Sequence, residues 1–199
     1  PELVKRSMAL FQTDQFYNLC GLTEAGPGGV YLPPERHMDK LGAGGIPIMN
    51  TEVRVVDDDG NDVPPGVVGE MIIRGETVMK AYYKNPQATA ATIRDGWLYT
   101  GDLAVLDEDG YLTLVDRKKD MIITGGENVY STEVEQVLYA HPNVFEAAVI
   151  GLPHPVWGEM VAAVIVPKTG QGIQLDELEA FCRKSLAGYK IPRKIFIAE

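Results

Sequence analysis

The sequence predicts an α+β protein built in two parts, and three observations lead to this prediction. Through the first 115 residues, short apolar stretches are separated by turn residues at close spacing, which is typical of a small barrel or sheet. After residue 120 the pattern changes to helical and strand-like stretches in the same segment, as in a compact α+β unit. Five consecutive charged residues, Asp116 to Asp120, separate the two patterns. We therefore place a linker there, although such a run is also typical of a solvated turn.

The first part begins with a helix and a strand. Residues 2–12 carry a rough helical stripe of apolar side chains, and a strand-like stretch at 16–19 leads into Gly21. Residues 42–47 are predicted to be a loop. Alternation of apolar and charged residues at 51–56 then indicates a half-buried strand.

Acidic turns separate the following strands. Residues 57–62 read Asp-Asp-Asp-Gly-Asn-Asp, which is a turn but a poor calcium loop, because its glycine is misplaced and no glutamate closes it. Glycines bound a predicted strand at 69–75. Residues 103–115 are predicted to form a hairpin that turns at 107–110.

The second part contains two predicted helices and two predicted strands. Thr132 and Glu135 have the spacing of a capping box, for a helix that ends at His141-Pro142-Asn143. Residues 144–150 and 161–166 are predicted strands, and residues 175–186 a helix. The inward positions of this last helix are predicted to be Leu175, Leu178, Phe181, Cys182 and Leu186.

Composition excludes several classes of protein. The 199 residues are 45% hydrophobic and carry a formal charge of −10, so a nucleic acid would be repelled. No apolar run is long enough to span a membrane, and the first residues lack the pattern of a secretory signal. Cys20 and Cys182 have no disulfide or zinc spacing, which favours reduced thiols and a cytoplasmic location. Because the chain begins at Pro1 without an initiator methionine, we expect it to be a piece of a longer protein.

Five motifs follow one another along the chain: Tyr-Asn-Leu-Cys-Gly-Leu-Thr-Glu at 17–24, Gly-Glu at 69–70, Tyr-Thr-Gly-Asp at 99–102, Asp-Arg-Lys-Lys-Asp at 116–120 and Gly-Gly-Glu-Asn at 125–128. In order and spacing they resemble the later core motifs of adenylate-forming enzymes, specifically the C-terminal part of an acyl-CoA or aryl-CoA synthetase. The resemblance implies the end of a large AMP-binding N-terminal domain with a barrel-like subdomain at 1–116, a hinge at 117–120 and a lid domain at 121–199. It also implies a reaction of a fatty or aryl carboxylate with ATP and Mg²⁺, followed by transfer to coenzyme A (CoA).

The resemblance assigns nucleotide-binding roles to residues of the first part and the hinge. Asp102 corresponds to the carboxylate that accepts hydrogen bonds from the ribose hydroxyls, and Arg117 to a second ribose ligand. Gly21 and Thr23 correspond to the region of the α-phosphate, and Glu24 to a magnesium ligand. Structural alternatives remain: a turn residue for Asp102, a surface ion pair for Arg117 and a helix cap for Thr23.

Lys119 corresponds to the hinge residue, and the CoA contacts follow it. These contacts correspond to Gly125 and Gly126, where a backbone would approach the pantetheine arm, and to Trp157, Tyr189 and Lys190. An ordinary turn is the alternative for the two glycines, and a partly exposed core position is the alternative for Trp157.

The chain also departs from the family pattern. The phosphate-binding loop is expected upstream of Pro1 and the adenylation lysine beyond Glu199, so we expect this piece alone to be inactive. Cys20 stands where an aromatic residue usually stacks on adenine, with Tyr17 as a candidate substitute, and Ser131 stands where proline is common, which we expect to be neutral.

Other functions remain open at this point. A peptide-synthetase adenylation domain and a luciferase-like oxygenase are alternatives within the family. A non-catalytic nucleotide-binding or interaction module is the alternative from a different class, because missing catalytic segments are also expected of it.

Overall fold

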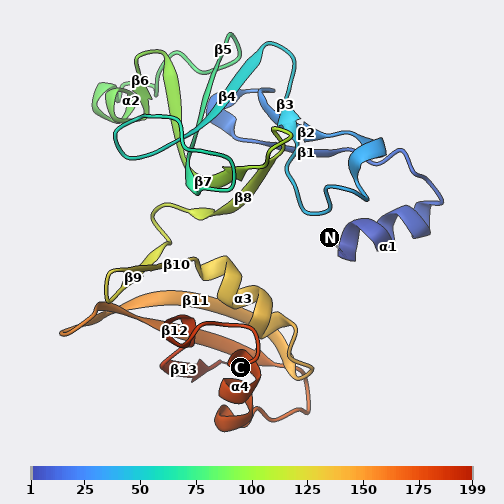
Figure 1. Cartoon of the computed structure of the whole chain (residues 1–199), viewed down its shortest axis with the longest axis vertical. Helices are drawn as coiled ribbons and strands as arrows, with labels where there is room; N and C mark the ends of the chain where they lie inside the picture. The colour runs from blue at the N-terminus through green and yellow to red at the C-terminus, as the bar shows by residue number, and fades with distance from the viewer. Residues whose placement is uncertain (1, 199) are drawn as a thin grey trace. The chain divides into compact units, whose positions relative to one another are not determined.

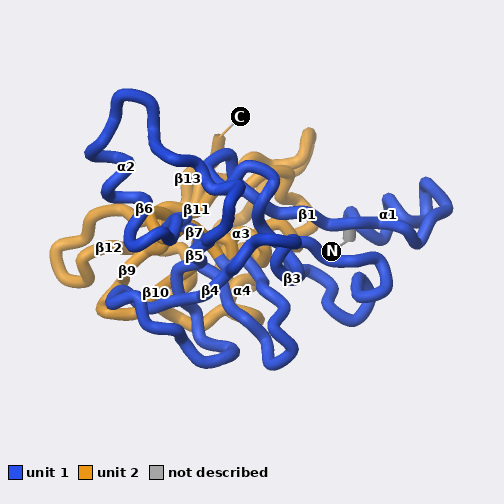
Figure 2. Tube along the Cα trace, turned by 90° about the horizontal axis from the view of Figure 1, so that it is seen from above, with its two compact units in different colours: residues 1–115 blue, residues 116–199 orange. Residues whose placement is uncertain are grey.

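The computed structural model describes residues 2–198, which divide into two compact units (Figure 2). Unit 1 comprises residues 1–115 and unit 2 residues 116–199. The boundary falls at the start of the charged run Asp116 to Asp120. Figure 1 labels the helices and strands of both units.

Unit 1 is built mainly of strands. Its elements in chain order are α1 (Glu2–Phe11), β1 (Asn18–Gly21), the 3-10 turn η1 (Thr23–Ala25), β2 (Gly29–Leu32), the 3-10 turn η2 (Pro34–Arg36), β3 (Ile46–Pro47), β4 (Thr51–Val56), β5 (Gly69–Gly75), α2 (Pro86–Thr92), β6 (Ile93–Arg94), β7 (Trp97–Leu106) and β8 (Leu112–Arg117), whose last two residues already belong to unit 2.

Two sheets share the core of unit 1. The strands β1, β2 and β3 form a small sheet in that order, and β4-β5-β7-β6 form a larger one in which β8 also pairs with β7. The fully buried core joins Val30 of β2 to Val55, Ile73, Leu98 and Leu112 of the larger sheet. The larger sheet curls in Figure 1, in agreement with the predicted small barrel or sheet.

Local patterns predicted most of these strands. The strands at 51–56 and 69–75 have the predicted bounds, and the hairpin at 107–110 joins strands that extend beyond the predicted 103–115. The predicted loop at 42–47 ends in the short strand β3. Helix α2 was not predicted, although Asn85 accepts a hydrogen bond from the Ala88 amide as an N-cap and Pro86 follows it.

Unit 2 has helices packed on a mixed sheet. Its elements are β9 (Ile122–Thr124), β10 (Glu127–Val129), α3 (Ser131–Tyr139), β11 (Val144–His154), β12 (Gly158–Pro167), α4 (Leu175–Cys182), the 3-10 turn η3 (Gly188–Lys190) and β13 (Lys194–Ile197). The sheet order is β10-β9-β12-β11, and β13 joins β12 as a parallel neighbour.

The core of unit 2 lies between this sheet and its two helices. Val134 and Leu138 of α3 and Leu178 of α4 are fully buried against the strands. Along β11, Ala147 and Val149 are buried, whereas Ala148 and Ile150 are exposed. The helices therefore cover one face of the sheet.

Two predictions about the helices of unit 2 were wrong. Thr132 and Glu135 form no capping box: Asp116 Oδ2 accepts hydrogen bonds from Ser131 Oγ (2.9 Å) and the Thr132 amide (3.3 Å), while Glu135 accepts one from the Val149 amide. The hydroxyl of Ser131, at the position where proline is common in the family, thus takes part in this contact at the helix start. The second helix ends at Cys182 rather than at residue 186, and Leu175 is exposed because it lies at the helix start.

Within residues 2–198, the helices are too short or too polar to cross a bilayer.

Candidate functional site

The Tyr-Thr-Gly-Asp motif lies in the middle of β7, where the backbone departs from regular strand geometry. Gly101 has a φ of +73°, which glycine adopts readily. The Thr100 hydroxyl donates to the Met71 carbonyl (2.7 Å), and the Gly101 amide donates to Glu70 Oε1 (3.1 Å). The Asp102 amide in turn donates to the Thr100 hydroxyl (3.1 Å). The neighbouring strand β5 therefore holds the backbone that carries Asp102.

Cys20 lies close enough to Asp102 for the negative charge of Asp102 to shift the pKa of its thiol. The thiol is half-buried, and burial raises its pKa, with a further rise caused by the negative charge of Asp102. A thiol with a raised pKa is mostly protonated at neutral pH and is a weak nucleophile. Cys20 and Cys182 are not paired with each other.

Glu24 lies in the 3-10 turn after β1. Its carbonyl accepts a hydrogen bond from the Met79 amide (2.7 Å), and its Oε1 accepts one from the Tyr82 hydroxyl (2.8 Å). This bond to Glu24 raises the pKa of Tyr82, and burial raises it further. A cavity of about 280 Å³ borders both side chains and is also lined by Thr100 and Gly101. Glu24 and the turn before Asp102 therefore share one cavity.

Gly21 and Thr23 precede Glu24, but neither lines that cavity. A Cβ added at Gly21 would meet the Gly28 carbonyl oxygen at 2.7 Å, so strand pairing alone requires a glycine there. Thr23 is exposed and is the first residue of the 3-10 turn, which has no side-chain cap. The helix-cap alternative for Thr23 is therefore wrong.

The donor set around Glu24 fits magnesium better than a metal held by protein ligands alone. Among residues 2–198 there is no group of three or more histidine, cysteine, aspartate or glutamate side chains that could hold a metal ion. Magnesium is usually bound through one or two carboxylates and the phosphates of a nucleotide. Glu24 lines the cavity together with a second carboxylate, Glu70, and the residues present therefore fit such an ion.

The charged run Asp116 to Asp120, which contains the predicted hinge, opens unit 2. Asp116 accepts a hydrogen bond from the Arg117 amide through Oδ1 (2.7 Å), while its Oδ2 caps α3. The amides of Asp120 and Met121 both donate to the Arg117 carbonyl, which closes a turn around exposed Lys119. A cavity of about 570 Å³ separates this turn from Glu135 and from Glu159 of β12. Asp102 and Arg117 belong to different units.

Gly125 and Gly126 form the turn of the β9-β10 hairpin. Both have positive φ values, +61° and +88°, which is typical of two-residue hairpin turns. The Gly125 amide donates to the Trp157 carbonyl (2.9 Å), and a Cβ at Gly125 would lie 3.8 Å from the Trp157 ring. The turn and Trp157 are thus neighbours.

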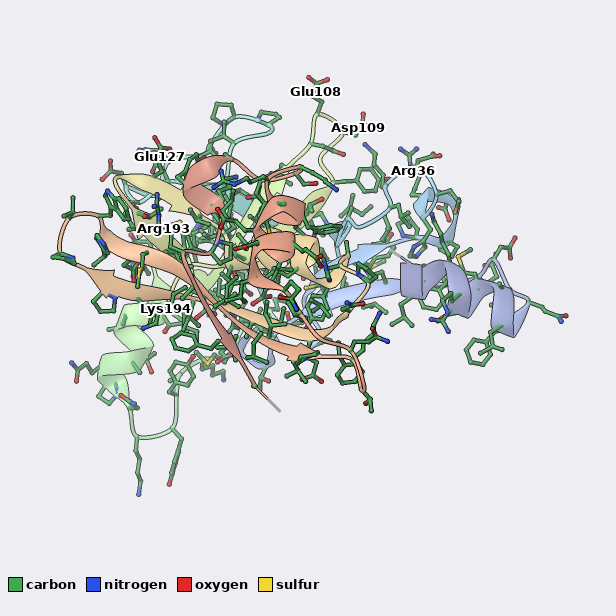
Figure 3. The ribbon with its side chains drawn as sticks, turned by 90° about the horizontal axis from the view of Figure 1, so that it is seen from below. Arg36, Glu108, Asp109, Glu127, Arg193 and Lys194 are labelled. Carbon is green, nitrogen blue, oxygen red and sulfur yellow. The ribbon has the colours of Figure 1, made fainter. Side chains whose placement is uncertain are left out.

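Trp157 lies in a cluster of stacked side chains. The His154 ring is parallel to the indole at 4.3 Å, and the Arg193 guanidinium lies 4.0 Å from the centre of the indole ring. Figure 3 labels Arg193 and Lys194 at the start of β13. Neither His154 nor Arg193 was singled out from the sequence, because only folding brings them to Trp157.

Lys190 has a structural partner. Its ammonium donates to both oxygens of Glu133 in α3, at 2.8 and 2.7 Å. Burial acts to lower the pKa of Lys190, but the bonds to Glu133 outweigh this effect and hold the pKa above its ordinary value. Tyr189 is exposed, and Lys190 lies 5.8 Å from the centre of its ring.

The two-unit α+β fold, with five motifs in this order along it, defines the class as the adenylate-forming enzymes. Residues 1–83 match the family model of the AMP-binding enzymes, and residues 133–199 match the model of the AMP-binding enzyme C-terminal domain. The chain belongs to the AMP-binding enzyme family.

Its relatives are longer CoA ligases. The chain is 50% identical over 175 residues to a feruloyl-CoA synthase from Amycolatopsis. This match covers 88% of this chain and 36% of the relative. It is 45% identical over 179 residues to a long-chain-fatty-acid–CoA ligase from Salmonella typhimurium, covering 90% of this chain and 32% of that ligase. The chain thus spans about a third of the length of these relatives, in agreement with the expected piece of a longer protein.

Solved structures share the fold. The o-succinylbenzoate CoA synthetase of Bacillus subtilis, solved with its acyl-adenylate intermediate, is 40% identical with a TM-score of 0.85. The match covers 92% of this chain and 37% of that structure. The same enzyme has been solved with ATP and a magnesium ion, with a TM-score of 0.83.

Proposed function

We propose that this chain is the nucleotide-binding end and the lid of an ATP-dependent acyl-CoA synthetase. The complete enzyme would join a carboxylate to ATP, forming an acyl-adenylate and pyrophosphate. It would then transfer the acyl group to the thiol of CoA, releasing AMP. The relatives act on aryl and fatty carboxylates according to their names, so we place the substrate in those classes.

The observation that carries this proposal is the fixed turn at Asp102. The Thr100 hydroxyl donates to the Met71 carbonyl of β5, and the Gly101 amide donates to Glu70 of the same strand. A carboxylate has two acceptor oxygens, which suits the two hydroxyls of a ribose. A backbone that is held in advance loses little freedom on binding, which would favour nucleotide affinity.

Other residues of the site receive the roles implied by the family. Glu24 would hold the magnesium ion of the nucleotide, which would neutralise phosphate charge, and Thr23 and Gly21 would approach the α-phosphate. Arg117 would add a second bond to the ribose, where its planar group of donors serves hydroxyl oxygens well. Lys119 would be the hinge at which the lid turns between the two half-reactions.

In unit 2, the paired glycines and Trp157 would meet CoA. Their adjacency supports this proposal, because the hairpin turn offers a backbone without side chains next to an indole face. Tyr189 and Lys190 would extend the same surface. For Lys190 this would require a phosphate to share or replace the bond to Glu133.

The test is product analysis of the natural gene product that contains this sequence. It is incubated with ATP, CoA and a panel that includes ferulate, o-succinylbenzoate and long-chain fatty acids. We expect pyrophosphate and AMP release that depends on one of these acids, together with the matching thioester. Asp102→Ala should lower kcat/KM about tenfold to hundredfold, because hydrogen bonds to a charged acceptor are worth roughly 1.5–3 kcal/mol.

Glu108→Ala is the matched control, since Glu108 is an exposed acid at the hairpin tip (Figure 3) and should leave kcat/KM unchanged. A folded natural gene product that releases neither pyrophosphate nor AMP with any acid would contradict the proposal and favour a non-catalytic nucleotide-binding module.

A further inference from the structure

Tyr82 makes a direct contact with the proposed magnesium ligand, Glu24. Its hydroxyl donates to Glu24 Oε1 at 2.8 Å across 58 positions of sequence. Among residues 2–198, this is the hydrogen bond that the Glu24 carboxylate makes, and Oε2 has no partner there. The carboxylate is thus held through one oxygen, while the other is left for a ligand.

The backbone of Glu24 is held independently of its side chain. Its carbonyl accepts a bond from the Met79 amide, and the next residue, Ala25, is fully buried. The amide of Ala25 closes the 3-10 turn on the Leu22 carbonyl. With the backbone fixed at both sides, the remaining freedom of Glu24 is rotation of its side chain, and Tyr82 restricts that rotation.

Tyr82 is itself held by the helix that follows it. The Tyr82 amide donates to the Thr89 hydroxyl (3.0 Å), which donates to the Asn85 carbonyl (2.8 Å). Asn85 caps α2 through its side chain, and its amide donates to the Tyr82 carbonyl. The start of the short helix α2 therefore anchors the tyrosine that contacts Glu24.

The cavity brings this support to the nucleotide site. Glu24 and Tyr82 line its wall together with Thr100 and Gly101, the two residues before Asp102. On that other side, Glu70 accepts the Gly101 amide. Tyr82 thus holds the Glu24 carboxylate itself, and Glu70 holds the backbone segment that leads to Asp102.

We infer that Tyr82 is a positioning residue for Glu24: its hydroxyl fixes one carboxylate oxygen so that the other is available to the magnesium ion of the nucleotide. This inference rests on the proposed function, because Glu24 must be the magnesium ligand for Tyr82 to act through it. Outer partners that orient a metal ligand typically contribute tenfold to hundredfold in metal affinity. The loss on removing the Tyr82 hydroxyl should fall in that range.

The chain supplies a matched control in the next residue. Tyr82→Phe removes the hydroxyl and retains the ring, whereas Tyr83→Phe makes the same change on a side chain that is 88% exposed. The probe is Mn²⁺ in place of Mg²⁺, measured by electron paramagnetic resonance on the natural gene product with a non-hydrolysable ATP analogue. Calorimetry with the same analogue in EDTA measures nucleotide affinity without metal.

We expect Tyr82→Phe to weaken Mn²⁺ binding about tenfold to hundredfold and to leave nucleotide affinity in EDTA unchanged within about twofold. Tyr83→Phe should match the wild type in both measurements. Glu24→Gln should weaken Mn²⁺ binding at least as much, and the double variant should be no weaker than Glu24→Gln alone, because Tyr82 acts through Glu24.

Three results would overturn the inference. If Glu24→Gln weakens Mn²⁺ binding and Tyr82→Phe does not, Tyr82 has no positioning role although the proposed function stands. If Tyr82→Phe lowers nucleotide affinity equally in EDTA, the hydroxyl supports the fold rather than the carboxylate. If Glu24→Gln has no effect, or the wild type binds neither metal nor nucleotide, the proposed role of Glu24 fails and the inference fails with it.

Discussion

At the scale of single residues, the chemistry of this chain depends on pairs that are far apart in the sequence. Glu24 meets Tyr82, Gly101 meets Glu70, and Cys20 lies within the electrostatic reach of Asp102. The first pair joins a motif residue, Glu24, to a residue outside the motifs, and the second pair joins two motifs; in both, the contact is a hydrogen bond. The function of the motif residue therefore includes the partner that holds it.

The pair of Cys20 and Asp102 leads to a prediction about thiol reactivity. Asp102→Asn removes the negative charge that helps to raise the pKa of Cys20, so a larger fraction of the thiol is ionised at pH 8. Alkylation of Cys20 by iodoacetamide should become a few times faster, since burial, the larger cause of the raised pKa, remains. Cys182, in unit 2, serves as an internal reference whose rate should not change. Equal acceleration of both cysteines, or of neither, would contradict the prediction.

Sequence reasoning reached some of these residues and missed others for a physical reason. Asp102 and Glu24 could be singled out because each lies in a short motif whose neighbours are also typical of the family, and their roles stay predictions. Tyr82 could not be singled out, because its hydrogen bond joins it to a residue 58 positions away and no local sequence pattern indicates this contact. The sequence did contain a signal for the helix that follows Tyr82, because Asn85-Pro86 is a typical helix start and predicts α2.

At the scale of elements, helix α3 shows how a local rule can be overridden. Thr132 and Glu135 have the spacing of a capping box, but the acceptor for the Thr132 amide is Asp116, which lies 16 residues earlier in the chain. Glu135 is then free to accept the Val149 amide and fasten α3 to β11. The strands at 51–56 and 69–75 were predicted within their bounds because alternation and bounding glycines act locally.

Removal of this distant cap should weaken unit 2. Asp116→Ala leaves the Ser131 hydroxyl and the Thr132 amide without their acceptor, and the loss of a cap costs about 1 kcal/mol. Urea unfolding followed by Trp157 fluorescence, in a Trp97→Phe background, reports on unit 2 alone. Asp120→Ala is the control, because Asp120 is an exposed acid of the same hinge. Equal stability of the two variants would show that Asp116 is not the cap in solution.

The ion pair between α3 and η3 gives a prediction about pH. The pKa of Lys190 in the folded chain lies above its ordinary value of 10.5, so its contribution to stability is fully present below that value. The contribution is lost as the pH rises through the raised pKa. The difference in unfolding midpoint between the wild type and Lys190→Met should therefore be constant from pH 7 to pH 9 and shrink near pH 11. A difference that grows with pH would contradict this assignment.

At the scale of the whole molecule, the chain consists of two units with separate cores and complementary proposed tasks. Unit 1 carries Asp102 and Glu24, and unit 2 carries the hinge turn, the paired glycines and Trp157. The fold class was predictable because strand and helix patterns change at one charged run. The supporting contacts were not, because each of them depends on how a unit folds back on itself.

The 199 residues alone are expected to be inactive. Neutralisation of phosphate charge by cationic groups accounts for much of the catalysis at phosphoryl centres, and the family's phosphate loop and adenylation lysine are expected outside residues 1–199. A single-turnover assay of this chain with ATP and a carboxylate should release no measurable pyrophosphate. Robust release would show that residues 1–199 contain sufficient catalytic groups.

The proposed activity requires these residues to be one portion of a larger ligase, and the intact mass of the natural gene product is the first measurement to make. Mass spectrometry of the protein isolated from its source should give a value more than twice the 21.8 kDa of this chain, because the relatives are about three times as long. A natural product of 21.8 kDa would contradict the account. It would leave the nucleotide site and lid without their phosphate-binding segments and favour a non-catalytic module.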